Sequence, residues 1–359
     1  MVQTFGFLDT QYIDFLDAQN EAAIRETNRA GVSYEELFRI LDGGLSALAN
    51  SRDPLIEKYV QPTTQRYVSQ RFGSNRIWQR GAEYTPGRPQ LGQEAEQYEL
   101  PIWSFEVDLG TTRRALRDMG REDFTSEVRD TIQSIAKGHR ADVLERMFFK
   151  TEFPLDSRAM GGKSPGFAGA GNPDITGVDI YGKDLPANYT HYFHGTDVAA
   201  NIRTALDGAI AAMERWHRGR LEIMPTEDMA DRIATWTTDE DFVPAQEWLI
   251  RSAVDRPEAL VNSDTYLGVY KFKYPVLKPE AQLTGINAAI VPAALSRKPL
   301  AWRYNENWGR EVRSEDRSLF PLTELIIMRD YGIGVLDRVG MALVSAGAGA
   351  NYINPGVDR

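Results

Sequence analysis

The sequence contains no cysteine and little lysine. The absence of cysteine excludes disulfide bonds, cysteine-ligated zinc, iron–sulfur clusters and thiolate catalysis. Of the 41 basic residues, nine are lysine and the other 32 are arginine. The planar guanidinium of arginine makes bidentate contacts with carboxylates and is enriched at protein interfaces. The bias therefore favours a protein with extensive interfaces, although a GC-rich genome or a thermophilic host produces the same bias.

Long apolar runs and an excess of positive charge are also missing. The longest nearly apolar stretch, residues 285–295, falls short of the about 18–20 residues that a membrane-spanning helix needs. Acidic residues number 51 and the net charge is −10, which argues against a protein whose main task is to grip nucleic acid. The first basic residue is Arg25, so the N-terminus is unlike a secretory signal. We expect a soluble protein made in the cytosol.

The 359 residues are 42% hydrophobic and 26% charged, enough for a sizeable core and about two domains. Apolar spacing predicts helices near 12–24 and from Ser33 onward, where Ser33-Tyr34-Glu35-Glu36 forms a capping box. Gly43-Gly44 is expected to interrupt the second helix. Residues 51–73 predict an extended arm along a surface, because prolines and polar residues separate their aromatic side chains.

Residues 74–102 are charged and poor in apolar side chains, and they surround a Thr85-Pro86-Gly87 turn. They predict a long two-stranded hairpin in which 76–80 pairs with 96–102. An isolated hairpin is not stable in water, so we expect this one to lie on a neighbouring molecule. The side chains expected to form that assembly interface are charged or aromatic: Arg76, Trp78, Arg80, Tyr84, Arg88, Glu94 and Glu96.

The middle of the chain carries the clearest periodic patterns. Residues 103–109 alternate apolar and polar side chains and predict a strand with one buried face. Residues 123–150 place an apolar side chain at every third or fourth position and predict a helix about 40 Å long. His139 lies on the apolar stripe of that helix and is interpreted as a core histidine.

After that helix the pattern becomes mixed. A glycine-rich loop region spans 151–194 and is expected to be functional or mobile. Further helices are predicted near 196–216, 228–236 and 244–252, and further strands near 266–276, 283–291, 324–329 and 334–344.

Two motifs in the glycine-rich region could carry chemistry. Residues 162–166 spell G-x-S-x-G around Ser164, the pattern of a hydrolase nucleophile, but no strand precedes the serine and no helix follows it. His191 and His194, with Asp197 nearby, could offer metal ligands, yet without a helix their spacing does not make them converge. A flexible loop and surface or interface histidines are favoured. We therefore expect no catalytic residue, no metal and no cofactor.

Taken together, the charged hairpin, the strand, the long helix and the C-terminal strands resemble the major capsid proteins of tailed bacteriophages, the Hong Kong 97 type fold. The likeness rests on 76–108, 123–150 and 324–344, where Arg329-Asp330-Tyr331-Gly332-Ile333 opens a segment similar to the family's closing strand. The resemblance implies an α+β fold with an N-terminal arm, an extended hairpin loop, a peripheral domain with a spine helix, and an axial α/β domain.

The resemblance also assigns boundaries to these parts. They are N-terminal helices and arm at 1–73, extended hairpin loop at 74–102, peripheral domain at 103–220 with spine helix 123–150, axial domain at 221–323, and return to the peripheral domain with tail at 324–359.

In function, the resemblance implies self-assembly through pentamers and hexamers into an icosahedral shell, assembled in the host cytoplasm. The shell would enclose double-stranded DNA without sequence-specific binding. Scaffold, portal and decoration proteins are further partners of such a shell, and no membrane is involved. Two alternatives stay open: an encapsulin-like cellular compartment shell, and a hydrolase that uses Ser164 or the His191/His194 loop.

The lysine positions bear on how such a shell is held together. Some members of the resembled family join neighbouring subunits by an isopeptide bond from an extended-loop lysine to an asparagine. This sequence has no lysine between Lys58 and Lys137, and arginine stays protonated and is a poor nucleophile. We expect a shell held by non-covalent contacts.

Overall fold

The computed structural model describes part of the chain, and the structural statements below refer to that part. The described residues are 31–50, 53–70, 96–109, 118–150, 153–154, 163–169, 185, 189–236, 241–245, 265–294, 297–304, 313–316 and 325–359. The helix predicted near 12–24 lies outside them.

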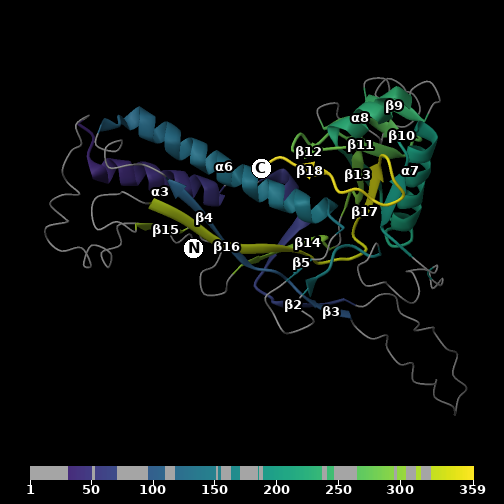
Figure 1. The fold of residues 1–359 in the computed structure, drawn as a ribbon, viewed down its shortest axis with the longest axis horizontal. Helices are drawn as coiled ribbons and strands as arrows, with labels where there is room; N and C mark the ends of the chain where they lie inside the picture. The colour runs from purple at the N-terminus through teal and green to yellow at the C-terminus, as the bar shows by residue number, and fades with distance from the viewer. Residues whose placement is uncertain are drawn as a thin grey trace, which may run out of the picture.

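The longest helix, α6 (Arg121–Phe148), confirms the helix predicted at 123–150 and begins two residues earlier. Its first turn carries Glu122 and Asp123 and its last turn Arg146, an order that suits the helix dipole. Figure 1 shows α6 running from the end of the molecule that holds α3 to the sheet beside α7. It is the element that spans both halves of the structure.

A second helix, α3 (Tyr34–Asn50), packs along the N-terminal half of α6. One of the two hydrogen bonds of the predicted capping box is present: the backbone N–H of Glu36 donates to the Ser33 hydroxyl at 3.2 Å. The predicted interruption at Gly43-Gly44 is wrong, because α3 continues through both glycines. A Cβ on Gly44 would lie 2.4 Å from Ile132 Cδ1 of α6, so glycine lets the two helices approach closely. Burial at this contact offsets the low helix propensity of glycine.

The arm predicted at 51–73 is only partly extended. Residues 54–59 form a short helix, α4 (Pro54–Tyr59), because Asp53 accepts the backbone N–H of Leu55 at 2.8 Å and proline suits a first helical turn. The chain then becomes β1 (Val60–Thr63), which pairs in parallel with β14 at the edge of a sheet. The arm is therefore part of the folded body up to this point.

Five described strands form the first sheet around one long strand, β16. The start of β16 lies between β15 and β4, and its C-terminal half pairs with β14. Strand β16 continues to Val335, past the end of the strand predicted at 324–329. The strand predicted at 334–344 is in the structure a later and shorter one, 342–346. The strands are β1 (Val60–Thr63), β4 (Trp103–Leu109), β14 (Leu300–Tyr304), β15 (Arg313–Asp316) and β16 (Leu325–Val335). The strand predicted at 103–109 is confirmed as β4, although Trp103, on the face expected to be buried, is 38% exposed.

Seven described strands form the second sheet, in the order β7-β17-β13-β8-β11-β10-β9. They are β7 (Tyr192–Gly195), β8 (Leu221–Pro225), β9 (Phe242–Pro244), β10 (Tyr266–Tyr270), β11 (Tyr274–Leu277), β13 (Asn287–Pro292) and β17 (Ala342–Ala346). The helices α7 (Ala199–Glu214) and α8 (Glu227–Ala234) pack on one face of this sheet.

One prediction in this sheet needs correction. The single strand expected at 266–276 is a hairpin, whose turn places Lys271 and Phe272 at φ 48° and 54°. Lys273 donates its backbone N–H to the Tyr270 carbonyl at 3.1 Å, which completes a type I′ turn. Pro244 ends strand β9 and the next residue, Ala245, is helical; the rest of the helix predicted near 244–252 lies outside the described residues.

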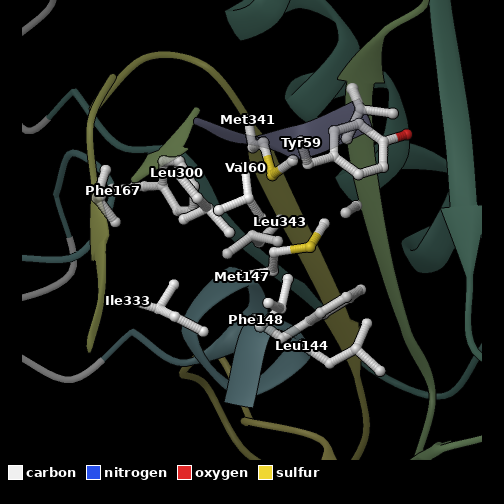
Figure 2. Packing of buried hydrophobic residues seen from close by; sticks show 14 of the residues in the cluster. Tyr59, Val60, Leu144, Met147, Phe148, Phe167, Leu300, Ile333, Met341 and Leu343 are labelled. Carbon is white, nitrogen blue, oxygen red and sulfur yellow. The ribbon is translucent and has the colours of Figure 1, made fainter. Parts of the chain in front are cut away.

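The two sheets share one core, into which the C-terminal end of α6 inserts. Successive residues of β13 face opposite ways: Ile290 packs with α7 and α8, and Val291 packs with α6. Figure 2 shows side chains from α6, β14, β16 and β17 meeting in this core. The labelled residues are Tyr59, Val60, Leu144, Met147, Phe148, Phe167, Leu300, Ile333, Met341 and Leu343.

The last residues of the chain return to α6. Strand β18 (Gly356–Val357) pairs with β12 (Leu283–Thr284), and the Tyr352 hydroxyl donates to the Phe148 carbonyl at 2.8 Å. The Arg359 guanidinium lies 3.1 Å from the Asp142 carboxylate of α6. Each sheet thus contains strands from both sides of a boundary expected at 220 or 323. The division into domains stays a prediction.

The neighbouring glycines of α3 allow a matched test of the contact between α3 and α6. Gly43→Ala places a Cβ with no described atom within 4 Å and should stabilise the fold by about 0.5–1 kcal/mol. Gly44→Ala must displace Ile132 and Val128 and should cost about 1–3 kcal/mol despite the same gain in helix propensity. Denaturant unfolding of both variants measures the difference; equal stabilisation by both would contradict the close contact.

Candidate assembly interface

Most of the residues expected to form the assembly interface lie outside the described residues. These are Arg76, Trp78, Arg80, Tyr84, Arg88 and Glu94. Glu96 is the first residue of β3 (Glu96–Glu99). The structure therefore describes where this segment leaves and re-enters the folded body, and the roles of these side chains stay predictions.

The base of the segment is a two-stranded ladder whose register differs from the expected one. Strand β2 (Tyr67–Gln70) pairs antiparallel with β3, with Tyr67 opposite Glu99 and Gln70 opposite Glu96. The pairing predicted between 76–80 and 96–102 is therefore wrong for the residues from Glu96 to Glu99. The ladder therefore joins residues on either side of a 25-residue segment, 71–95, that lies outside the described residues.

Polar contacts hold the base of this ladder to the body. Glu99 is buried, and its carboxylate accepts the Arg66 Nε–H at 2.5 Å. The backbone N–H of Leu100 donates to the Arg66 carbonyl at 2.8 Å, and Arg303 of β14 donates to the Leu100 carbonyl at 2.7 Å. Because Leu100 is bonded through both backbone groups, it is held on the five-stranded sheet.

Apolar packing at Leu100 strengthens this attachment. Its side chain is fully buried in a cluster with Val68, Ala301 and Leu336. The chain at Leu100 and Pro101 crosses close to β16: a Cβ at Gly332 would lie 2.2 Å from the Pro101 carbonyl oxygen. Only glycine allows this crossing without movement of the backbone. The ladder thus gives the segment between β2 and β3 a fixed base.

In the structure, Ser164 lies in the protein core. Its side chain is fully buried in β6 (Lys163–Ser164), which pairs with β5 (Phe153–Pro154). Arg146 of α6 donates to the Ser164 carbonyl at 3.0 Å and also to the Pro165 carbonyl, and Arg338 donates to the Gly166 carbonyl at 3.4 Å. A hydrolase nucleophile must be exposed on a strained turn, so the hydrolase interpretation of Ser164 is wrong.

The sequence analysis did not predict the burial of Arg146 and Arg338. Both side chains are fully buried, and they bind the carbonyls of consecutive residues in the G-x-S-x-G segment. The backbone carbonyls of the motif therefore accept hydrogen bonds from two buried guanidinium groups. The burial of Arg146 could have been predicted from its position, because it lies next to Met147 on the apolar side of α6.

The two candidate histidine ligands are held by other groups. His191 is fully buried; its Nδ1 contacts the Met341 carbonyl at 2.6 Å and its Nε2 the Tyr189 hydroxyl at 2.9 Å. His194 contacts the Ser345 hydroxyl at 3.0 Å and the Gly349 carbonyl at 3.1 Å. In the described part of the chain, no three His, Asp or Glu side chains are grouped so that they could hold a metal ion. The hydrolase interpretation of this loop is not supported.

His139 confirms the interpretation as a core histidine. It is buried beside Trp302 and Tyr331, with ring centroids 5.4 and 5.0 Å away, and Arg329 lies 3.2 Å from its Nδ1. Burial, followed by the positive charge of Arg329, lowers the pKa of His139 to about 3. Burial likewise lowers the pKa of His191 to about 4. Both imidazoles are neutral in the folded protein at neutral pH.

No described helix is long and apolar enough to span a membrane. No protein-family profile and no curated protein matches the chain.

Three solved structures show what the chain is similar to. A chain of Mycobacterium phage Patience is 13% identical with a TM-score of 0.60, over 93% of this chain and 94% of its own. A capsid chain of a native GTA particle is 13% identical with a TM-score of 0.46, over 81% and 88%. The holo-SrpI encapsulin of Synechococcus elongatus PCC 7942 is 12% identical with a TM-score of 0.43, over 84% and 90%.

The buried histidines predict a loss of stability in mild acid. Each has a lower pKa folded than its usual value of 6.5, so below pH 6.5 the unfolded chain binds protons that the native chain does not. Each should therefore lower the free energy of unfolding by about 2 kcal/mol between pH 7 and pH 5. Denaturant unfolding should show that His139→Gln loses about 2 kcal/mol less than wild type over this interval. An identical loss in both proteins would contradict a neutral buried His139.

The match with the Mycobacterium phage Patience chain, at a TM-score of 0.60, extends over nearly the whole of both chains. The fold of this chain is the Hong Kong 97 type capsid fold.

Proposed function

We propose that the chain is the major capsid protein of a tailed phage, and that its copies assemble into an icosahedral shell around double-stranded DNA. The observation that carries the proposal is the capsid fold, shared with the Mycobacterium phage Patience chain over 93% and 94% of the two chains. Scaffold, portal and decoration proteins would be its partners, and assembly would take place in the host cytoplasm. The DNA would be enclosed without recognition of its sequence.

The fixed base of the hairpin segment supports this proposal. A segment that leaves a buried attachment at Leu100 can transmit a contact made at its far end to the body of the subunit. In the proposed shell, Arg76, Arg80 and Arg88 meet carboxylates of an adjacent subunit, and Trp78 is the apolar anchor. An exposed ion pair contributes only about 0–1 kcal/mol, but a shell repeats each pair in every subunit.

The proposal also assigns roles to the two halves of the structure. The five-stranded sheet with α6 as its spine would form the peripheral part of a subunit, and the seven-stranded sheet would form the axial part within pentamers and hexamers. The shared core at the end of α6 would then fix the angle between the two parts. Subunits with one fixed angle are suited to building a closed surface.

Shortening the hairpin tests assembly directly. Replacing residues 81–93 by a short turn leaves the anchored ladder β2–β3 in place, so the subunit should fold with an unchanged unfolding midpoint. Wild-type protein should form particles in negative-stain electron microscopy, and the shortened variant should stop at free subunits or capsomers. A monomeric wild-type protein at all ionic strengths would overturn the capsid proposal. Normal particles from the variant would overturn only the role of the hairpin. Wild-type particles that hold a cargo enzyme in place of DNA would indicate the encapsulin alternative.

The lysine distribution predicts that the shell contains no covalent links between subunits. No lysine lies between Lys58 and Lys137, and no cysteine is present. Particles boiled in SDS should therefore migrate as one band near the chain mass of 40.4 kDa. A ladder of covalent pentamers and hexamers would contradict the prediction and would point to one of the nine lysines outside this interval.

A further inference from the structure

A basic cleft opens where α7 ends and β8 begins. Figure 1 shows α7 in the half of the molecule that carries the seven-stranded sheet. The volume of the cleft is about 860 Å³. One wall is the loop from His217 to Arg220, and the other is the start of β11 with Lys273. Neither the fold nor the proposed shell contacts described above account for a cleft of this size and charge.

The cationic side chains of the cleft stand on an anchored backbone. The N–H of Ala293 donates to the Arg220 carbonyl at 2.8 Å, and His217 Nε2 contacts the Val339 carbonyl at 3.1 Å. On the opposite wall, the Lys273 ammonium lies 2.6 Å from the Glu214 carboxylate. The backbone of the loop and the Lys273 ammonium are therefore positioned before any ligand binds.

The charge of the cleft is opposite to that of the chain. Among the described residues that line it, Glu214 is the one acidic side chain, and it is already engaged by Lys273 and by the Tyr274 hydroxyl at 2.8 Å. Arg218 and Arg220 are both exposed. In a chain with a net charge of −10, this cleft is a local site of attraction for an anion.

The lining also discriminates between classes of anionic partner. A protein segment bound in a cleft usually needs an apolar or aromatic anchor. The apolar lining residues Leu221 and Tyr274 are only 2% and 9% exposed, so they offer little surface to such an anchor. The phosphate backbone of a nucleic acid needs only positive charge and hydrogen-bond donors. The cleft therefore suits phosphate better than an acidic peptide.

We propose that this cleft binds the phosphate backbone of nucleic acid without reading its sequence, through Arg218 and Arg220 with Lys273 beside them. The inference rests on the proposed function only for the source of the nucleic acid, which is the enclosed DNA. Two or three cations in each subunit give a weak contact repeated over a shell. Such a contact can order DNA near the protein and still release it.

The test measures salt-dependent binding of a labelled 12-base-pair DNA duplex by fluorescence anisotropy. The duplex is added to dissociated full-length protein before assembly, so that the cleft is reachable whichever face of a shell it lines. Each lost phosphate contact lowers the slope of log affinity against log salt by about 0.9. Arg218→Gln with Arg220→Gln should therefore lower that slope by about 2 and weaken binding about tenfold or more at 0.1 M salt. The matched control is Arg129→Gln with Arg232→Gln, which removes the same charge outside the cleft.

Equal slopes in the cleft variant and the control variant would overturn the proposal. Cleft-dependent binding of poly-glutamate, with no binding of the duplex, would overturn it in favour of an acidic protein partner. Inorganic pyrophosphate should compete with the duplex, and failure to compete would show that phosphate is not the group recognised. Electron microscopy of the same proteins keeps the two proposals apart: shells without the slope change contradict only the cleft, and a slope change without shells contradicts only the capsid function.

Discussion

The structure depends on the insertion of the C-terminal turns of α6 between the two sheets. Leu144, Met147 and Phe148 are fully buried there, in contact with strands of both sheets. Removal of these side chains would therefore leave a cavity that borders both sheets. Burial of each such side chain contributes about 1.5–3 kcal/mol, and the same few residues therefore hold together elements far apart in the sequence.

The sequence predicts those elements that have a clear local pattern of apolar and polar side chains. The spacing from Phe124 to Met147 marks α6, the alternation from Trp103 marks β4, and Ser33 with Glu36 marks the start of α3. In each case the pattern is local and strong. His139 was interpretable for the same reason, because its neighbours on the apolar stripe place it in the core.

The errors occur where a contact with a distant segment decides the local structure. Gly44 lies inside a helix because its missing side chain admits α6, a fact that appears nowhere in α3 itself. The base of the hairpin is set by Leu100 packing on β14 and β16, which moves the ladder to Tyr67–Gln70. For the residues proposed to act in assembly, the sequence pattern shows charge and aromatic character but identifies no partner, so their role stays a prediction.

The buried guanidiniums of Arg146 and Arg338 have a consequence for how the molecule opens. Arginine keeps its charge in proteins, so its burial needs hydrogen-bond acceptors, and the carbonyls of Ser164, Pro165 and Gly166 are among them here. The Arg338 carbonyl in turn accepts the N–H of Ala168, and the Ala168 carbonyl accepts the N–H of His191. The end of α6, the loop and the segment after β16 therefore cannot detach one at a time without breaking hydrogen bonds to a buried cation. They should form one cooperative unit, whose amides exchange with solvent together and late, whereas the helical contact at Gly44 is free to loosen earlier.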